Sequence, residues 1–529
     1  MYRFLPLAIV ILLTGAFAAL MAISPWFAIG VVFFAALSLL GLYDLLQTSH
    51  TLWRNYPILA RIRWIAEELR PFLRSYIVES ETEGRPFNHE ERTMVYRRSK
   101  DVSSVEPFGS QLDIDKPPYE WLSHSIAARH NEDEDPRVMV GALGTAKPYS
   151  ASVLNISAMS FGSLGAHAIE ALNRGAAKGG FYHDTGEGGV SKYHRAGGGD
   201  LVWELGSGYF GCRARDGGFD RERFADVAAS DQIKMIEIKL SQGAKPGHGG
   251  VLPGSKVTAE IAEARGIPIG ETCFSPPAHT AFSTPTGLME WVGELRELSG
   301  GKPVGMKLCV GNRWEVLAIC KAILETEIKP DFIVVDGAEG GTGAAPAEFM
   351  DHIGAPLRQG LVLVRNALVG CGLKDEIRLA ASGKQISAFA MAASMALGAD
   401  WINTARGFMF SLGCIQSLNC HKNTCPTGIA TTNPSRQSGL VVSDKAERVY
   451  NFHRNTVRAL MEVVGAAGCS HPSELTPRHI MHRVTEDITE PGHIAYKLLK
   501  PGVLLEDPES TSLRREWSMA QAGSFAPVR

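Results

Sequence analysis

Three cysteines gather within twelve residues of the chain, in a spacing that is typical of a metal-binding loop. Cys414, Cys420 and Cys425 are separated by five and four residues, and Pro426 follows the last of them. Closely spaced thiols are far more often metal ligands than chance would give, and a proline after the final cysteine is common in iron–sulfur loops. Three ligands suit a 3Fe–4S cluster. The alternative is zinc held by the three cysteines and His421, although neighbouring residues are poor partners on one tetrahedral ion.

A phosphate-binding end is indicated just before these cysteines. One predicted strand ends in Ser382 and Gly383, and the next ends in Arg406 and Gly407. Backbone N–H groups at the start of a helix bind phosphate, and an arginine adds positive charge. This arrangement resembles the phosphate-binding half of FMN-dependent barrels. The alternative is two ordinary turns that end in glycine.

Lys307 and a glycine pair point to a flat ligand in the same region. Lys307 lies inside a predicted strand, where a buried lysine is costly unless it is paired. In a flavin site its partner would be the N1/O2 edge, where negative charge develops on reduction. The alternative is a salt bridge to a glutamate on a neighbouring strand. Gly340 and Gly341 follow another predicted strand and let the backbone lie against a flat ring or a phosphate.

Short β-rich runs alternate with amphipathic helical runs from about residue 150 onwards, the pattern of βα units around a parallel sheet. The predicted strands are 155–160, 181–185, 235–240, 304–310, 332–336, 378–381 and 401–404, with an eighth near 267–273. About eight such units predict an α/β fold that closes as a (β/α)₈ TIM barrel. The alternative is an open doubly wound sheet, but no Gly-x-Gly-x-x-Gly motif opens a helix in this sequence.

The sequence of residues 4–43 predicts a membrane segment. No charged residue occurs between Phe4 and Tyr43, and Ser24-Pro25 divides this stretch into two apolar halves. Each half approaches the roughly 20 residues that a helix needs to cross a bilayer. Arginines before and after the stretch predict a helical hairpin that anchors a cytoplasmic catalytic domain to the membrane. The alternatives are a cleaved signal peptide with a site near 16–18, or one spanning helix beside an interfacial one.

Composition excludes other classes of protein. The formal net charge of the 529 residues is −3, and the sequence has no basic stripe, so we expect no nucleic-acid partner. The nine cysteines form no regular framework, which argues against a secreted disulfide scaffold. We predict four parts: a transmembrane helical hairpin at 1–45, a helical and polar connecting region at 46–150, the barrel with its iron–sulfur loop at 151–435, and a helical extension at 436–529.

Five motifs taken together resemble the FMN-binding synthase domain of glutamate synthase. They are MSFGSL at 159–164, TGEGG at 185–189, IKLSQGAKPG at 238–247, GGTGA at 340–344 and CHKNTCPTG at 420–428. The match covers roughly residues 150–435, and the order of five separate motifs makes it specific. The tethered form is similar to the stand-alone, membrane-anchored members of the FMN-binding glutamate synthase family.

The resemblance implies a reaction and a set of site residues. In that family FMN reduces 2-iminoglutarate, formed from 2-oxoglutarate and ammonia, to L-glutamate, and electrons reach FMN through a 3Fe–4S cluster held here by the three cysteines. By resemblance, Lys245 and Arg265 bind the carboxylates of 2-oxoglutarate, and Glu187 and Lys245 are the catalytic residues. Two cations also suit a dicarboxylate. FMN is expected against Met159, Ser160, Gln242, Lys307, Gly340, Gly341, Ser382, Gly383, Arg406 and Gly407.

The sequence departs from the larger family members in ways that bear on substrate and partners. Val251 replaces a glutamine and His248 replaces an acidic residue, and Val251 cannot donate a hydrogen bond to a keto acid. We find no glutaminase region and no dinucleotide fingerprint, so we expect electrons from ferredoxin or a flavoprotein reductase subunit. Ammonia would be free or come from another subunit. The alternatives are an FMN oxidoreductase for another imino or keto acid, and a non-catalytic membrane redox relay.

Overall fold

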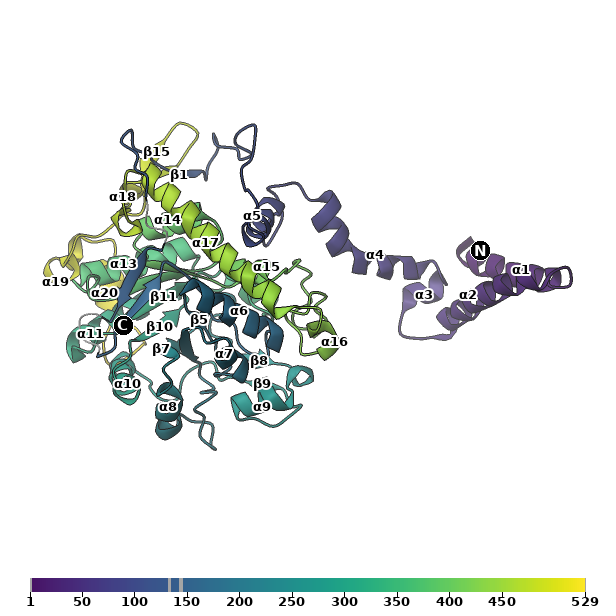
Figure 1. Ribbon diagram of the computed structural model, residues 1–529, viewed down its shortest axis with the longest axis horizontal. Helices are drawn as coiled ribbons and strands as arrows, with labels where there is room; N and C mark the ends of the chain where they lie inside the picture. The colour runs from purple at the N-terminus through teal and green to yellow at the C-terminus, as the bar shows by residue number, and fades with distance from the viewer. Residues whose placement is uncertain (1, 132–134, 142–145, 529) are drawn as a thin grey trace. The chain divides into compact units, whose positions relative to one another are not determined.

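A computed structural model describes residues 2–131, 135–141 and 146–528 of the chain (Figure 1). By its internal contacts the chain divides into two compact units, Met1–His89 and Glu90–Arg529. The finer division into four parts stays a prediction. The predicted site residues all fall in the second unit.

The second unit is built on a closed barrel of parallel strands. In chain order the barrel strands are β4 (Leu154–Ile156), β5 (His183–Asp184), β6 (Leu201–Leu205), β7 (Ile233–Lys239), β10 (Val304–Leu308), β11 (Phe332–Asp336), β12 (Arg378–Ser382) and β13 (Trp401–Thr404). Each strand pairs with the next, and β13 pairs with β4 to close the ring. The predicted TIM barrel is therefore confirmed.

One predicted strand is wrong. The barrel strand that the sequence analysis missed is β6. The segment near 267–273, which was predicted in its place, contains only the start of the short β9 (Cys273–Phe274). Strand β9 pairs with β8 (Val251–Leu252) in a separate two-stranded sheet that follows β7. Pro268 and Gly270 interrupt the pattern that suggested a strand, while Glu204 hides the true strand by breaking its apolar run.

The amino-terminal end of the barrel is closed by side chains. Buried residues at the starts of the strands, among them Tyr182, Phe332 and Trp401, pack into one cluster. The antiparallel pair β2 (Arg137–Val140) and β3 (Tyr149–Ser152) adds Val140, Tyr149 and Ala151 to the same cluster. Gly305 leaves space for the Phe332 ring, because a Cβ there would lie 2.4 Å from it. This end of the barrel is a packed floor, and ligands are confined to the other end.

Helices surround the barrel and their ends follow from local sequence. They include α6 (Ala166–Gly179), α7 (Lys192–Ala196), α8 (Arg221–Ala228), α10 (Pro285–Leu298), α11 (Arg313–Thr326), α13 (Leu357–Gly370), α14 (Ala388–Ala396) and α15 (Arg406–Ser411). Thr284 caps α10 ahead of Pro285, and Gly180 ends α6 at φ +66°. The long α17 (Val442–Ala466) runs along α6, where Gly175 of α6 lets Val449 approach (Figure 1).

Shorter elements complete the second unit. An antiparallel sheet joins β1 (Glu120–Leu122), β14 (Ile480–Arg483) and β15 (Thr489–Pro491). The last helices are α18 (Gly492–Ala495), α19 (Val503–Glu506) and α20 (Arg514–Met519). Near the start of the unit lies α5 (His89–Ser99), which contacts the cysteine loop described below.

The first unit begins with two apolar helices that pack as a hairpin. They are α1 (Leu5–Leu20) and α2 (Ala28–Leu46), and the Phe17 and Phe34 rings lie 5.2 Å apart between them. One helical stretch, Pro25–Leu46, is long and apolar enough to cross a membrane, whereas α1 is shorter. The carboxylate of Asp44 is buried near the end of α2 and binds Arg61 at 2.7 Å. The next helices are α3 (Thr51–Asn55) and α4 (Ala60–Leu73).

Candidate active site

A single cavity at the carboxyl ends of the barrel strands brings together most of the predicted site residues. Those that line it are Met159, Ser160, Glu187, Gln242, Lys245, Arg265, Lys307, Gly340, Gly341, Ser382, Gly383, Arg406 and Cys420. Gly407, Cys414 and Cys425 lie outside the lining. Parallel strands point their carboxyl ends to one face, so motifs distant in sequence meet there.

Glycines shape one wall of the cavity as a shallow cradle. A Cβ on Gly341 would lie 2.7 Å from Nε of Arg406, and Gly383 has φ +132°. Neither position tolerates a larger side chain without displacing its neighbours. Ser382 lies beside Ser157, with 3.4 Å between their hydroxyl oxygens. Among the described residues Arg406 forms no ion pair, so this wall offers an unmatched positive charge beside open backbone.

A second wall of the cavity carries an excess of positive charge. Lys239, Lys245 and Arg265 surround the carboxylate of Glu187, and Nζ of Lys239 lies 3.1 Å from it. Burial alone would raise the pKa of Glu187, but Lys239 and the other two cations hold it below its usual value. Burial lowers the pKa of Lys245, which Glu187 opposes. Three cations share one carboxylate, so the wall is matched to an anion with two negative charges.

Arg265 forms no direct ion pair with any residue that the structure describes. Its side chain is 4% exposed, and its guanidinium lies over the Phe210 ring with 4.9 Å to the ring centre. One Nη donates weakly to Ser160 Oγ at 3.4 Å and to the Phe161 carbonyl at 3.3 Å, and Nε has no hydrogen-bond partner. Buried donors of this kind are costly unless a ligand satisfies them.

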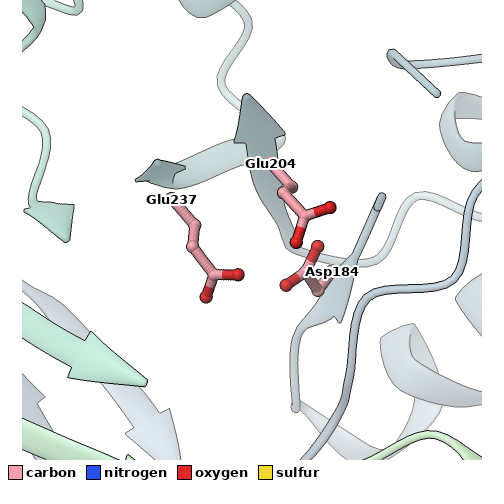
Figure 2. A group of neighbouring side chains, drawn as sticks. All are labelled: Asp184, Glu204 and Glu237. Atoms are coloured by element: carbon pink, nitrogen blue, oxygen red, sulfur yellow. The ribbon is translucent and has the colours of Figure 1, made fainter. Parts of the chain in front are cut away.

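A buried charged layer lies beneath these walls, inside the barrel. The carboxylates of Asp184, Glu204 and Glu237 face one another with their oxygens within 4.8 Å (Figure 2). Lys307 Nζ binds Glu204 and lies 3.1 Å from Glu237. The structure thus contains the alternative partner for Lys307, a glutamate on the neighbouring strand β7, and adds a second glutamate on β6. Its ammonium supplies the positive charge that a metal ion would otherwise provide to these carboxylates.

The protonation of this layer follows from its burial. Burial, with the neighbouring charge of Glu204, raises the pKa of Asp184 to about 7. Burial also raises the pKa of Glu237 well above its usual value. For Lys307 burial acts to lower the pKa, but Glu204 and Glu237 raise it well above its usual value. Lys307 is therefore charged at neutral pH, whereas Glu237 keeps its proton there and Asp184 is only partly ionised.

The cysteine loop lies against the glycine-rich wall. A Cβ on Gly343 would lie 3.7 Å from Cβ of Cys420, so the two loops are adjacent. Tyr96 of α5 donates from its hydroxyl to the Cys414 carbonyl at 2.6 Å and so holds the start of the loop. The three thiols are close enough for their charges to interact. The loop and the cavity thus form one continuous site.

The surroundings of the thiols differ. Burial raises the pKa of Cys414 to about 11. Burial would also raise the pKa of Cys425, but the Thr427 hydroxyl and three backbone N–H groups hold it below its usual value. Sulfur that accepts several N–H bonds is prepared for the thiolate form, which is the form that binds metal.

Several residues at the site escaped the sequence analysis. Lys239 is two residues from Glu237 on β7, so both side chains point into the barrel. The alternation of side chains along the strand could have predicted this position from the sequence. Lys256, in a loop after β8, also lines the cavity, and no motif marked it. Val251 lines the cavity as well, whereas His248 packs against Phe349 outside the lining.

Comparison with known proteins places these features in a family. Residues 129–470 match the family model described as the conserved region in glutamate synthase. The chain is 35% identical over 500 residues to "Glutamate synthase large subunit-like protein YerD" of Bacillus subtilis, covering 86% of this chain and 95% of that protein. It is 34% identical over 314 residues to "Archaeal glutamate synthase [NADPH]" of Methanocaldococcus jannaschii, covering 59% of this chain and 58% of that protein.

The chain belongs to the glutamate synthase family. The predicted family, and with it the class of glutamate synthase-type oxidoreductase, is confirmed. Among solved structures, a mutant flavocytochrome b2 with pyruvate bound is 15% identical, with a TM-score of 0.42, over 83% of this chain and 90% of that one. The barrel itself is established by the pairing of its strands.

Lys307→Met tests how much the charged layer depends on its only lysine. Removing one partner of a buried ion pair costs about 3–5 kcal/mol, because the carboxylates lose their counter-charge. We expect a loss of that size in urea-induced unfolding followed by tryptophan fluorescence in detergent. Lys329→Met, which breaks an exposed pair with Glu376, should cost less than about 1 kcal/mol. Equal losses in the two variants would show that the layer does not depend on Lys307.

Proposed function

We propose that this protein is an FMN- and iron–sulfur-dependent enzyme that forms L-glutamate by reducing 2-iminoglutarate, made from 2-oxoglutarate and ammonia. The observation that supports it most is the cationic wall, where Lys239, Lys245 and Arg265 outnumber Glu187 inside a buried cavity. A dicarboxylate supplies the two negative charges that this wall lacks. Membership of the glutamate synthase family supports the same reaction.

FMN suits the cradle described above. Its phosphate would lie against Ser382, Gly383 and Arg406, and its ring against Gly340 and Gly341. The cradle supports this assignment because Gly341 lets Arg406 lie close to the backbone and because Arg406 forms no ion pair with the residues that the structure describes. FMN, when bound, supplies two-electron reduction of the imine. The chain's own residues bind and orient the acid, and burial keeps water from the imine.

The cationic wall is proposed to bind and polarise the substrate. Lys245 and Arg265 would hold the two carboxylates, and Lys239 keeps Glu187 ionised beside them. An ionised Glu187 can hold an ammonium ion by its charge beside the place where the imine forms.

A cluster rather than zinc is proposed for the cysteine loop. Zinc–sulfur bonds of about 2.3 Å put the sulfurs on one zinc ion roughly 3.8 Å apart. Among the described residues, the carboxylates of Asp184, Glu204 and Glu237 have ligand atoms within 4.8 Å of one another. The sulfurs of Cys414, Cys420 and Cys425 do not meet that distance. Wider spacing is what a cluster needs, because each thiolate binds a different iron. A 3Fe–4S cluster would use all three.

The electron donor is proposed to be ferredoxin or a flavoprotein reductase subunit. Its electrons would reach the cavity through the cysteine loop, whose Cys420 lines the cavity wall. The test is a steady-state assay with reduced ferredoxin, ammonia and 2-oxoglutarate, in which we expect L-glutamate to accumulate.

Val251 favours a second candidate, reduction of another imino or keto acid. Flavin reoxidation by such an acid alone would support that candidate, and reoxidation by no acid would leave a membrane redox relay.

Membrane attachment through α1 and α2 is proposed for the first unit, with the second unit in the cytoplasm. Val32 and Leu39 of α2 are 71% and 68% exposed, so apolar side chains face outward with nothing from the unit to cover them. Lipid would cover them without cost.

Arg265→Gln should weaken binding of the acid while FMN stays bound. Loss of a charged hydrogen bond costs about 1.5–3 kcal/mol, so KM for 2-oxoglutarate should rise about ten- to a hundredfold. Arg213→Gln is the matched control, because Arg213 also lies over Phe210 but does not line the cavity. The assignment fails if both variants have the same KM, or if Arg265→Gln loses FMN.

Cys420→Ser should remove the cluster. We expect iron per chain and the visible absorption of the cluster to fall steeply, because serine is a poor ligand for iron–sulfur clusters, while flavin content stays the same. Cys469→Ser is the control, since Cys469 is buried outside the loop. Unchanged iron in Cys420→Ser, or zinc in place of iron in the unmodified protein, would contradict the assignment.

Val32→Arg with Leu39→Arg should release the protein from membranes. Each arginine near the centre of a spanning helix costs about 2.5–3.5 kcal/mol. The unmodified chain should stay in the membrane pellet after an alkaline carbonate wash, and the variant should move to the supernatant. Leu505→Arg, an exposed position in α19, should behave like the unmodified chain. An unmodified chain that is washed off would refute membrane anchoring.

A further inference from the structure

Lys256 is a buried lysine whose position has no role in the proposed reaction. It ends a short 3₁₀ turn at Gly254–Lys256, and it is 3% exposed. Its Nζ donates to three backbone carbonyls, those of Ser163 at 3.0 Å, Cys420 at 3.2 Å and Ala430 at 3.3 Å. These three segments are far apart in sequence and meet at this ammonium.

The charge of Lys256 is unmatched within the described part of the chain. Among the residues that the structure describes, Lys256 forms no ion pair, whereas the buried Lys307 has two glutamates. Carbonyl dipoles satisfy the hydrogen bonds of an ammonium but do not neutralise it, and a buried unpaired charge is costly. Cys420 and Cys425 are the residues whose negative forms would act on the charge of Lys256. The position therefore suits a negative centre formed by the cysteine loop.

Two of the three carbonyls that accept from Lys256 belong to that loop or to the segment directly after it. Cys420 is a proposed ligand, and the N–H of Ala430 donates to the sulfur of Cys425. The third contact, to Ser163, joins the loop to the segment that follows β4. A single ammonium thus fixes the backbone of one proposed ligand and a hydrogen-bond donor to another.

We propose that Lys256 is the built-in counter-charge of the iron–sulfur cluster: it positions Cys420 and favours the reduced cluster. Reduction adds a negative charge to the cluster, and a nearby buried cation stabilises that charge because the surroundings have a low dielectric constant. Lys256 is a positioning residue, since it acts through the loop and its field. This inference rests on the proposed cluster.

The test is a redox titration of the full-length protein, followed by the EPR signal of the cluster, with iron and flavin measured beforehand. Lys256→Gln keeps two N–H donors but removes the charge, so we expect iron to be retained and the cluster's reduction potential to fall. Lys256→Arg keeps the charge and should stay near the unmodified value. Lys422→Met, an exposed lysine in the same loop, is the matched control and should shift the potential little, because solvent and salt screen its charge.

The outcomes separate this inference from the proposed function. If Lys256→Gln loses iron while Lys256→Arg keeps it, the counter-charge is needed for the cluster to form, which supports the inference. A Lys256→Gln potential equal to that of Lys422→Met would overturn it, as would equal loss of iron in the Gln and Arg variants. A raised KM for 2-oxoglutarate with an unchanged potential would instead make Lys256 a substrate ligand. An unmodified protein without iron would overturn the cluster itself.

Discussion

A closed ring of eight parallel strands must fill its own interior, and in this protein one layer of that filling is charged. Lys307 binds two glutamates and lies beside Asp184, all of them almost completely buried. The ends of β5, β6, β7 and β10 are tied together through this layer. Since those ends also carry the cavity wall, the geometry of the site depends on charges that never meet solvent.

Charge is arranged in levels along the barrel axis. The floor is apolar and aromatic, the layer above it is acidic with one lysine, and the cavity wall near Glu187 is cationic. Cations at the wall stay available for a ligand because the acids below are already satisfied by Lys307 and by retained protons. Lys256 places a further buried cation beside the cysteine loop, and among the described residues it has no acidic partner.

Motifs along the chain predicted the barrel and most of the cavity, because a strand followed by clustered glycines implies a ligand at its carboxyl end. Seven barrel strands follow from apolar runs, whereas β6 was missed because Glu204 points inward. The partners of Lys307 could be foreseen only as a class, since Glu237 lies on the adjacent strand β7 but Glu204 lies on β6, one strand further round the ring. Lys256 could not be foreseen at all. Its three carbonyl partners are 93, 164 and 174 residues away along the chain.

The packed floor also has a kinetic consequence. Tyr182, Phe332 and Trp401 leave no passage through the amino-terminal end of the barrel, because each is at most 1% exposed. Ligands therefore enter and leave the cavity only across the loops at the opposite end of the barrel. Any product formed in the cavity must therefore leave across the same loops before another substrate molecule can bind.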